Sequence, residues 1–463
     1  MNLLDKSVPA SKTILLLAWP TIMEQILQTM VSFVDTAMVG SIGPVATAAI
    51  SVNTSTIWLV NGIMNAFSIG FSVLIAKNIG SRSIDQARHM ARQCIIWTAV
   101  FGLALTAVMS IIGRYLAIWL NAEPSVAVQA ALYMKWIAAA YLGQFMLISC
   151  SGILRSTGDT KTPLLVNILN NLANIVLNYF LIFETRTVTA FGRSILMPGA
   201  GMGVEGAAMA TGAAAVLSAI LLLGACIVKP SEAQVSLRGS WRPQSGALRT
   251  SLRLGTPVFL ERITISVGQI ALTAIVSSIG TAALAAHYVA NTAESITYLP
   301  AYGFATAVTT LVAQSLGAGD KALARRFANV CTSFGVVTMT VTGAAMYIFA
   351  PQLVGIFSSD AEVIAMGTRC LRIEAFAEPF FALSILIFGV LRGSGDTKGP
   401  FLIGLAGMWG IRIPLAFILV RFTSLGLAGA WLAMMLDLMA RGIFCFFRLS
   451  RGSWLDAFER QHI

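Results

Sequence analysis

The feature that most restricts the fold of this chain is a succession of long apolar segments with few charges. Twelve such segments, each of 22 to 30 residues, follow one another along the 463 residues. About 20 mainly apolar residues in a helix are enough to cross the hydrocarbon core of a bilayer. Because an isolated segment in lipid satisfies its backbone hydrogen bonds only as a helix, we expect twelve transmembrane helices. They are expected at residues 13–38, 47–76, 94–116, 130–153, 163–184, 204–228, 254–279, 284–313, 331–354, 366–391, 400–421 and 425–447.

Composition excludes the soluble alternatives. Hydrophobic residues make up 57% of the chain and charged residues only 11%, against about 25% charged residues in soluble domains. A soluble core of this composition would leave large apolar patches in water. The six cysteines lie in apolar segments without paired spacing, so we expect small buried residues and no disulfide framework. The sequence therefore indicates an all-α polytopic membrane protein.

The net charge of +11 raises the alternative of a nucleic-acid partner. With the N-terminus inside, however, 22 of the 31 Lys and Arg residues fall on cytoplasmic loops, tails and span ends, seven fall on outer loops and span flanks, and two, Arg262 and Arg412, lie deeper within spans. This distribution follows the positive-inside rule. The basic excess therefore predicts no nucleic-acid binding. It predicts a multi-pass protein in contact with membrane lipid, with both termini cytoplasmic.

An internal repeat divides the chain. A shift of 237 residues pairs Glu24 with Glu261, and it superimposes Gly-Asp-Thr-Lys at 158–161 on the same four residues at 395–398. Six spans in each half give the halves one orientation, related by an axis along the membrane normal, and such halves usually enclose a central cleft. We predict an N-lobe (1–228), a cytoplasmic linker (229–253) and a C-lobe with a cytoplasmic tail (254–463).

Polar residues on the first and fifth spans are the strongest candidates for a site. Asp35 lies in the outer half of the first span, on one face with Glu24 and Gln28, while Asn174 and Asn178 lie one turn apart on the fifth. Ionisable residues inside a membrane are costly and therefore usually functional. A carboxylate with two amide oxygens suits a hard cation or a proton, so Asp35, Asn174 and Asn178 are a candidate Na⁺ site. The alternative is hydrogen bonding that joins helices.

A second set of polar residues is expected to line a substrate cavity. They form stripes on the second and eighth spans and a pair one turn apart on the tenth. Glu24 and Gln28 of the first span belong to the same set. The alternative for these stripes is polar packing between helices. The candidate cavity residues are Glu24, Gln28, Asn61, Asn65, Asn291, Glu294, Tyr298, Glu374 and Glu378.

Glu261 on the seventh span is a further candidate for ion or proton coupling. It follows Pro257 by four residues, and a proline frees backbone carbonyls near the buried carboxylate. The alternative is a local pair with the adjacent Arg262. For Asp437 on the twelfth span, a pair with Arg441 one turn later is the preferred interpretation.

Four motifs resemble those of multidrug and toxic compound extrusion (MATE) transporters, and the resemblance covers essentially the whole chain. They are Val-Asp-Thr-Ala-Met-Val-Gly at 34–40, Pro-x-x-x-Glu at 257–261, Leu-Gly-Ala-Gly at 316–319 and Leu-Arg-Gly-x-Gly-Asp-Thr-Lys at 391–398. The chain is most similar to bacterial NorM-type members. The resemblance implies two six-helix lobes around a V-shaped cleft, in a bacterial cytoplasmic membrane.

The resemblance also implies roles for single residues. Asp35 matches the acidic position of the N-lobe, Asn174 a sodium-site asparagine, and Glu261 the C-lobe glutamate of NorM-type members. Position 178 is acidic in some members and is Asn178 here. A tenth-helix aspartate of some relatives falls on Phe381, and Glu294, Glu374 or Glu378 are the candidates to replace it.

The sequence therefore predicts a secondary active antiporter that exports amphipathic organic cations in exchange for Na⁺ or H⁺ by alternating access. We expect no enzyme activity, no cofactor and a monomer. A flippase of lipid-linked precursors is the alternative, but it would favour a cationic cavity, whereas the candidate span charges are mostly acidic. A receptor would normally bring a soluble signalling domain, and the sequence shows none.

Overall fold

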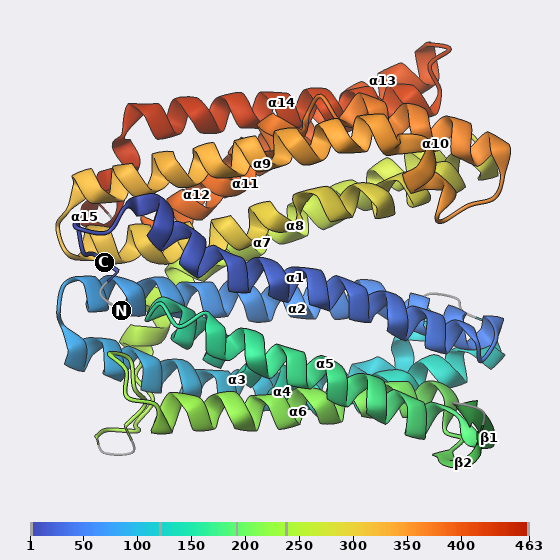
Figure 1. The fold of residues 1–463 in the computed structure, drawn as a ribbon, viewed down its shortest axis with the longest axis horizontal. Helices are drawn as coiled ribbons and strands as arrows, with labels where there is room; N and C mark the ends of the chain where they lie inside the picture. The colour runs from blue at the N-terminus through green and yellow to red at the C-terminus, as the bar shows by residue number, and fades with distance from the viewer. Residues whose placement is uncertain (1–2, 120–122, 191–192, 237–238, 461–463) are drawn as a thin grey trace. The chain divides into compact units, whose positions relative to one another are not determined.

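The computed structural model describes residues 3–119, 123–190, 193–236 and 239–460, which are almost entirely helical (Figure 1). Each predicted span lies almost wholly on these helices. In chain order the helices are α1 (Ala10–Gly40), α2 (Pro44–Gly80), α3 (Ile84–Trp119), α4 (Pro124–Ser156), α5 (Lys161–Ile182), α6 (Gly203–Val228), α7 (Ser245–Ser277), α8 (Thr281–Gly317), α9 (Lys321–Gly355), α10 (Ala361–Glu374), α11 (Glu378–Gly393), α12 (Lys398–Leu405), α13 (Ile413–Phe422), α14 (Leu427–Arg451) and α15 (Ala457–Arg460).

Eleven helices within the described ranges are long and apolar enough to cross a membrane, counting 398–422 as one, and the pair α10–α11 makes a twelfth. The predicted all-α fold with twelve spans is thereby confirmed. The tenth span, however, is not the continuous helix that we expected. It bends by 59° between Glu374 and Glu378, because Pro379, in the first turn of α11, lacks the N–H group that would continue the hydrogen bonds of α10.

The eleventh span also departs from a regular α-helix. A π-helical segment, η1 (Ala406–Arg412), lies between α12 and α13 and ends just before Pro414. Single π-helical turns within α-helices often occur at functional sites. Here the segment carries Arg412, the buried arginine described below.

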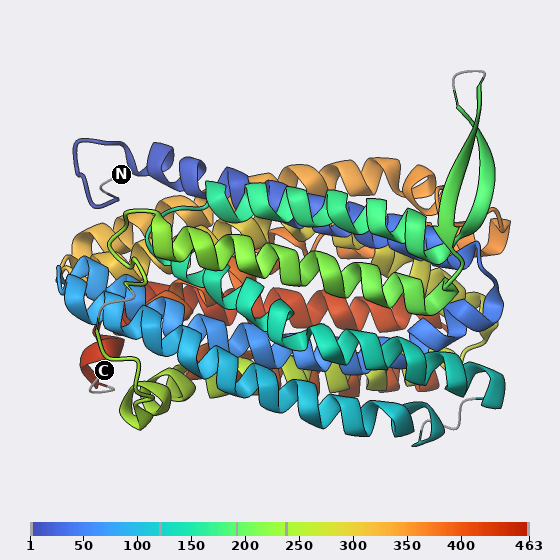
Figure 2. The same ribbon diagram turned by 90° about the horizontal axis from the view of Figure 1, so that it is seen from below.

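A β-hairpin occupies the connection between α5 and α6, where the sequence predicted only a loop. Strand β1 (Glu184–Ala190) pairs antiparallel with β2 (Arg193–Ala200), with Arg186 opposite Met197. Figure 2 shows the hairpin projecting from the helices of its own unit. The β-branched run at 187–189 is the local signal that favours a strand here.

The described chain forms two compact units, and their boundaries cut through helices α1, α2 and α7. Unit 1 consists of Met1–Gln25, Ala76–Arg82 and Leu252–Ile463, and unit 2 of Ile26–Ile75 and Ser83–Ser251. The lobe boundaries that we derived from the repeat remain a prediction.

The start of α1 contributes to the core of unit 1. Ile14 and Leu17 are buried in one apolar cluster with residues of α8, α9 and α11. The Oγ1 of Thr21 donates a hydrogen bond to the Gly303 carbonyl at 3.1 Å. A side chain at Gly303 would collide with Ile22, so α1 and α8 pack closely at this point.

The end of α2 also packs against α8 within unit 1. A Cβ atom on Gly80 would collide with the carbonyl of Gln314, and one on Gly317 would collide with the carbonyl of Lys77. The 237-residue shift pairs Gly80 with Gly317 and Lys77 with Gln314. The two helices therefore cross through equivalent positions of the repeat, and only glycine allows so close an approach.

Packing within each unit sets the neighbours of the candidate residues. In unit 2, α4 lies against α3 and α6, and α5 lies against α6. In unit 1, α8 packs on α9, α10 and α11, while α14 packs on α10, α11 and α13. The glutamates on α8, α10 and α11 therefore come from helices in mutual contact.

The repeated Gly-Asp-Thr-Lys motif forms an equivalent turn in each half. After α4, Gly158 adopts φ 86°, a left-handed conformation that favours glycine. The Oδ1 of Asp159 accepts a hydrogen bond from the backbone N–H of Thr162 at 3.1 Å. Its Oδ2 lies 2.5 Å from Nζ of Lys229, just after α6. The motif thus ties the loop after α4 to the end of α6.

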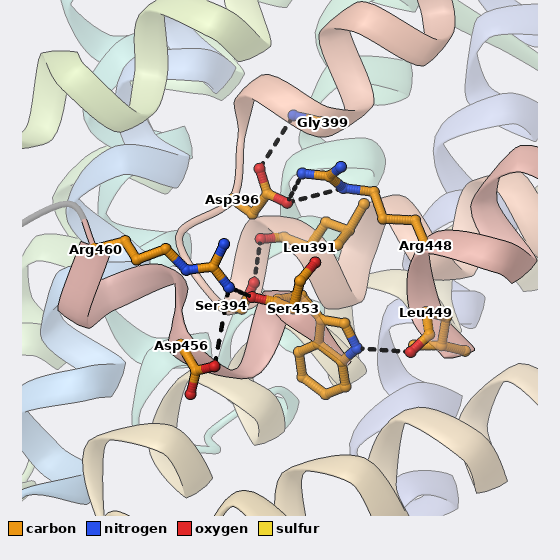
Figure 3. A network of polar contacts seen from close by, with 10 residues as sticks. Leu391, Ser394, Asp396, Gly399, Arg448, Leu449, Ser453, Asp456 and Arg460 are labelled. Atoms are coloured by element: carbon orange, nitrogen blue, oxygen red, sulfur yellow. Dashed lines mark hydrogen bonds and ion pairs between the residues drawn. The ribbon is translucent and has the colours of Figure 1, made fainter. Parts of the chain in front are cut away.

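The second copy follows α11 and is shown in Figure 3. Gly395 also has φ 86°, and Oδ1 of Asp396 accepts from the N–H of Gly399 at 3.2 Å. The Nε of Arg448, near the end of α14, donates to Oδ2 of Asp396 at 3.0 Å. Each half therefore joins the same loop to its last long helix by one carboxylate.

Candidate functional site

The structure brings Asp35, Asn174 and Asn178 together in unit 2, as the sequence predicted for neighbouring helices. The Nδ2 of Asn178 donates to Oδ1 of Asp35 at 2.7 Å and to Oδ1 of Asn174 at 3.1 Å. The Nδ2 of Asn174 in turn donates to Oγ1 of Thr211 on α6 at 3.1 Å. Thr211 was not predicted, because a single hydroxyl in an alanine-rich helix gives no signal in the sequence.

This cluster offers oxygen donors in a mostly dry environment. Asn174 and Asn178 are 4% and 1% exposed, and Asp35 is half-buried. The Oδ1 of Asn178 is buried and accepts no hydrogen bond from any described residue. A buried polar atom of this kind normally has a partner. One carboxylate with neutral amide and hydroxyl oxygens is a donor set that fits a hard cation such as Na⁺, or a proton on the carboxylate.

The donors do not resemble a transition-metal centre. No group of three or more His, Cys, Asp or Glu side chains within the described ranges could hold a metal ion. The six cysteines are buried and unbridged, as the sequence predicted.

Glu261 has a fixed cationic partner in unit 1. Its carboxylate oxygens lie 2.7 and 2.9 Å from Nη2 of Arg392, the arginine of the Leu-Arg-Gly motif. Glu261 is 3% exposed. The structure therefore pairs it with α11, and not with the adjacent Arg262 that we considered as the alternative.

Three further glutamates form a buried acidic cluster in the same unit. Glu294 on α8, Glu374 on α10 and Glu378 on α11 are each no more than 6% exposed, and their charges are close enough to interact. The Oγ1 of Thr297 donates to Oε1 of Glu378 at 2.7 Å. Both carboxylate oxygens of Glu374 and the second oxygen of Glu378 lack a hydrogen-bond partner among the described residues.

Two arginines and Asp437 lie beside this acidic cluster. Asp437 is fully buried and accepts from Nε of Arg441 at 2.6 Å, which confirms the predicted helical pair. It also accepts from Nε of Arg412 at 2.7 Å. Arg412 was not predicted as a partner of Asp437. It lies 25 residues earlier, on a different helix, so helical spacing does not connect the two. Arg412 is also close to Glu294 and Glu374, and its positive charge interacts with both.

The other predicted cavity residues belong to different units. Glu24, Asn291 and Tyr298 lie in unit 1, whereas Gln28, Asn61 and Asn65 lie in unit 2. Glu24 is buried, and Gln28 and Asn65 are exposed. Asn65 and Asn291 donate to backbone carbonyls of their own helices, those of residues 61 and 287. A common substrate cavity remains a prediction for these six residues.

Comparison with known proteins identifies the family. The family model MatE matches residues 20–180 and 257–418, two stretches that begin 237 residues apart, like the repeat. A probable multidrug resistance protein NorM from Thermotoga maritima is 30% identical over 446 residues, which cover 96% of this chain and 93% of the relative.

Solved structures of the same fold are more distant in sequence. A crystal structure of a MATE protein in complex with MaD3S has a TM-score of 0.89 at 22% identity, with 97% of each chain covered. A MOP superfamily transporter from Pyrococcus furiosus, reported to have a binding pocket of reverse polarity, has a TM-score of 0.88 at 23% identity, again over 97% of each chain. The chain therefore belongs to the MatE family of multidrug and toxic compound extrusion transporters, which span the membrane and are not enzymes.

Proposed function

We propose that this protein is a secondary active antiporter, which exports amphipathic organic cations in exchange for Na⁺ or H⁺ by alternating access. The observation that carries the proposal is the contact between Asp35 and Asn178, together with the buried Oδ1 of Asn178 that has no partner. A half-buried carboxylate within a membrane helix is energetically costly, and such residues are therefore usually functional.

Coupling follows from competition for the same carboxylate. When Asp35 is charged and free, it can attract a cationic substrate. Binding of Na⁺ or a proton at Asp35 removes that attraction, and Asn174 and Asn178 supply carbonyl oxygens for Na⁺. Because binding free energies are reciprocal, the substrate weakens ion binding by the same factor. Entry of Na⁺ or H⁺ from outside, down its gradient, then drives the cycle.

The C-terminal half supplies a second charge-sensitive region. Glu294 and Glu374 lie close to Arg412, whose charge is shared with Asp437, and Glu378 lies close to Glu294. Neighbouring carboxylates repel one another when all are charged, so we propose that this cluster takes up a proton. Glu261 is already balanced by Arg392, and its proposed coupling role requires that pair to open.

The cellular setting is part of the same proposal. The bacterial relatives favour a bacterial cytoplasmic membrane, and the placement of basic residues favours both termini inside. The buried acidic residues favour cationic substrates over the pyrophosphate of a lipid-linked precursor, the alternative considered above. We propose a monomer with the lobes 1–228 and 254–463 as the moving parts.

The direct test is efflux of a fluorescent organic cation from vesicles, with the Na⁺ and pH gradients imposed separately. Wild-type protein should export the dye in response to one of them. Asp35→Asn should abolish coupled efflux at equal expression and insertion, whereas Asp456→Asn, an exposed carboxylate near the C-terminus, should not. Wild-type efflux by the Asp35 variant would refute the proposed role of this residue.

A binding measurement separates Na⁺ from H⁺. A ligand that binds only the folded state stabilises it in proportion to the logarithm of its excess. Na⁺ should therefore raise the melting temperature of the purified protein, the effect should fade at low pH, and Asn174→Ala should remove it. Asn65→Ala, an exposed amide of the same unit, is the matched control. If K⁺ or choline at equal ionic strength stabilises as much as Na⁺, the Na⁺ site is excluded.

A further inference from the structure

A pocket of about 640 Å³ lies in unit 1, apart from the residues discussed so far. It is lined by α9, α10 and α14 and by the break between α10 and α11. These helices are orange and red in Figure 1. On α14 the lining residues belong to the first half of the helix, away from the C-terminus. Its volume is in the range of pockets that hold small organic ligands.

Two arginines give this pocket its charge. Arg369 and Arg372 are three residues apart on α10, which puts them on one face of the helix. Both are exposed, and neither forms an ion pair with any acidic group in the described part of the chain. The guanidinium of Arg372 lies 5.5 Å from the ring centre of Tyr347, whose ring contacts that of Phe376 edge to face at 5.8 Å.

The surroundings of the two arginines are apolar and accessible. Phe376 is 63% exposed, Ile348 64% and Phe349 54%, and the floor of the pocket consists of Met, Leu and Ile side chains of α10 and α14. A surface of this kind on a membrane helix faces lipid. Arg372 lies six residues after the predicted start of the tenth span at residue 366, about 9 Å along the helix axis at 1.5 Å per residue.

An arginine at such a position needs an anionic partner, because an unpaired charge next to hydrocarbon is costly. The described residues supply none, so the partner must come from outside the protein. Thr368 adds a buried hydroxyl in the pocket wall that has no hydrogen-bond partner. A cationic substrate would be repelled by both guanidinium groups. A free phosphate ion would not use the apolar floor.

We propose that this pocket binds the headgroup of an anionic phospholipid from the surrounding leaflet. The lipid phosphate would lie between Arg369 and Arg372, with Thr368 as a further donor, and the acyl chains would lie along the apolar surface of α9 and α14. Paired arginines suit phosphate because the planar guanidinium donates two hydrogen bonds at once. The proposal concerns the C-terminal half and is independent of the ion-coupling site.

The test uses native mass spectrometry to measure lipid binding to the delipidated, detergent-solubilised full chain. Phosphatidylglycerol should bind more tightly than phosphatidylcholine with the same acyl chains. Arg372→Gln should weaken phosphatidylglycerol binding about fivefold, and Arg369→Gln/Arg372→Gln about 25-fold. Arg421→Gln, an exposed arginine of α13 in the same unit, should leave binding unchanged. Inorganic phosphate at millimolar concentration should not displace the lipid.

Equal binding of phosphatidylglycerol by the double variant and the wild type would overturn the proposal. So would displacement by inorganic phosphate, or an equal loss of phosphatidylcholine binding. A second measurement needs no variant: a photoreactive phosphatidylglycerol should label wild-type peptides containing 361–376 and 432–439. Labelling confined to other segments would place the lipid elsewhere.

Discussion

Replacement of Asp437 by Asn is expected to destabilise unit 1 more than any other Asp→Asn change in that unit. Asp437 is fully buried and forms ion pairs with two arginines, with Nε of Arg412 at 2.7 Å and Nε of Arg441 at 2.6 Å. The side chains of these arginines are only 5% and 7% exposed. The amide of Asn would remove the carboxylate that both guanidinium groups contact and would leave Arg412 with only the weaker interaction with Glu374.

The magnitude follows from the number of contacts and their burial. One charge pair at about 4 Å contributes about 4 kcal/mol at an effective dielectric constant of 20. Removal of one partner from a buried pair typically costs about 3–5 kcal/mol, because the other charge stays buried. With about 2–4 °C per kcal/mol for domains of roughly this size, the melting temperature should fall by about 10 °C.

The assay is thermal unfolding of the purified variant in detergent, which is measured as loss of the monodisperse chromatographic peak with temperature. Asp456→Asn is the matched control, because Asp456 forms its pair with Lys321 at the surface and its loss should not shift the melting temperature. The double variant Asp437→Leu/Arg441→Leu removes both members of the i,i+4 pair and leaves Arg412 near Glu374. It should recover most of the loss. A melting temperature for Asp437→Asn equal to that of the control would refute the reasoning.

Three further changes test other features. Glu261→Gln is expected to reduce export of cationic substrates more than that of matched neutral ones, whereas an equal loss in transport assays would assign Glu261 only to its arginine pair. Gly80→Ala should lower the melting temperature because the added Cβ meets a backbone carbonyl of α8, whereas Gly224→Ala, with no atom within 4 Å, should not. Burial alone would raise the pKa of Asp159, but hydrogen bonds from Lys229 and the next turn, together with the lysine charge, hold it below its usual value. This stabilisation is present above the unfolded pKa of about 3.9 and is lost as the pH falls through the folded pKa, so the difference in unfolding temperature between wild type and Asp159→Asn should vanish in strong acid. A difference independent of pH would contradict that assignment.

Local pattern and composition were sufficient for the number of spans and for contacts within one helix. The pair of Asp437 with Arg441 follows from helical spacing alone, and so does the shared face of Asn174 and Asn178, whereas their contact with Asp35 required α1 and α5 to be neighbours. Both features depend on the helical period of 3.6 residues, which the spacing of polar residues in the sequence shows directly.

Contacts between distant helices could not be predicted in the same way. Arg392 and Arg412 reach their carboxylates from segments 131 and 25 residues away, and only tertiary packing determines these pairings. The bend after Glu374 has a visible cause in Pro379, but a proline also occurs inside continuous helices such as α7 and α8. Its effect is therefore decided by the packing around it.

The contribution of the first helix to unit 1 has a consequence for how the gene can be divided. A chain cut in the linker between Val228 and Ser245 would yield two polypeptides, each with six predicted spans. The N-terminal fragment would carry Ile14 and Leu17, whose apolar neighbours belong to the other fragment. The C-terminal fragment would lack them and would leave a hollow in its core, which is destabilising. The two halves of the repeat are therefore not independent folding units, and the fragments should be recovered only when they are co-expressed.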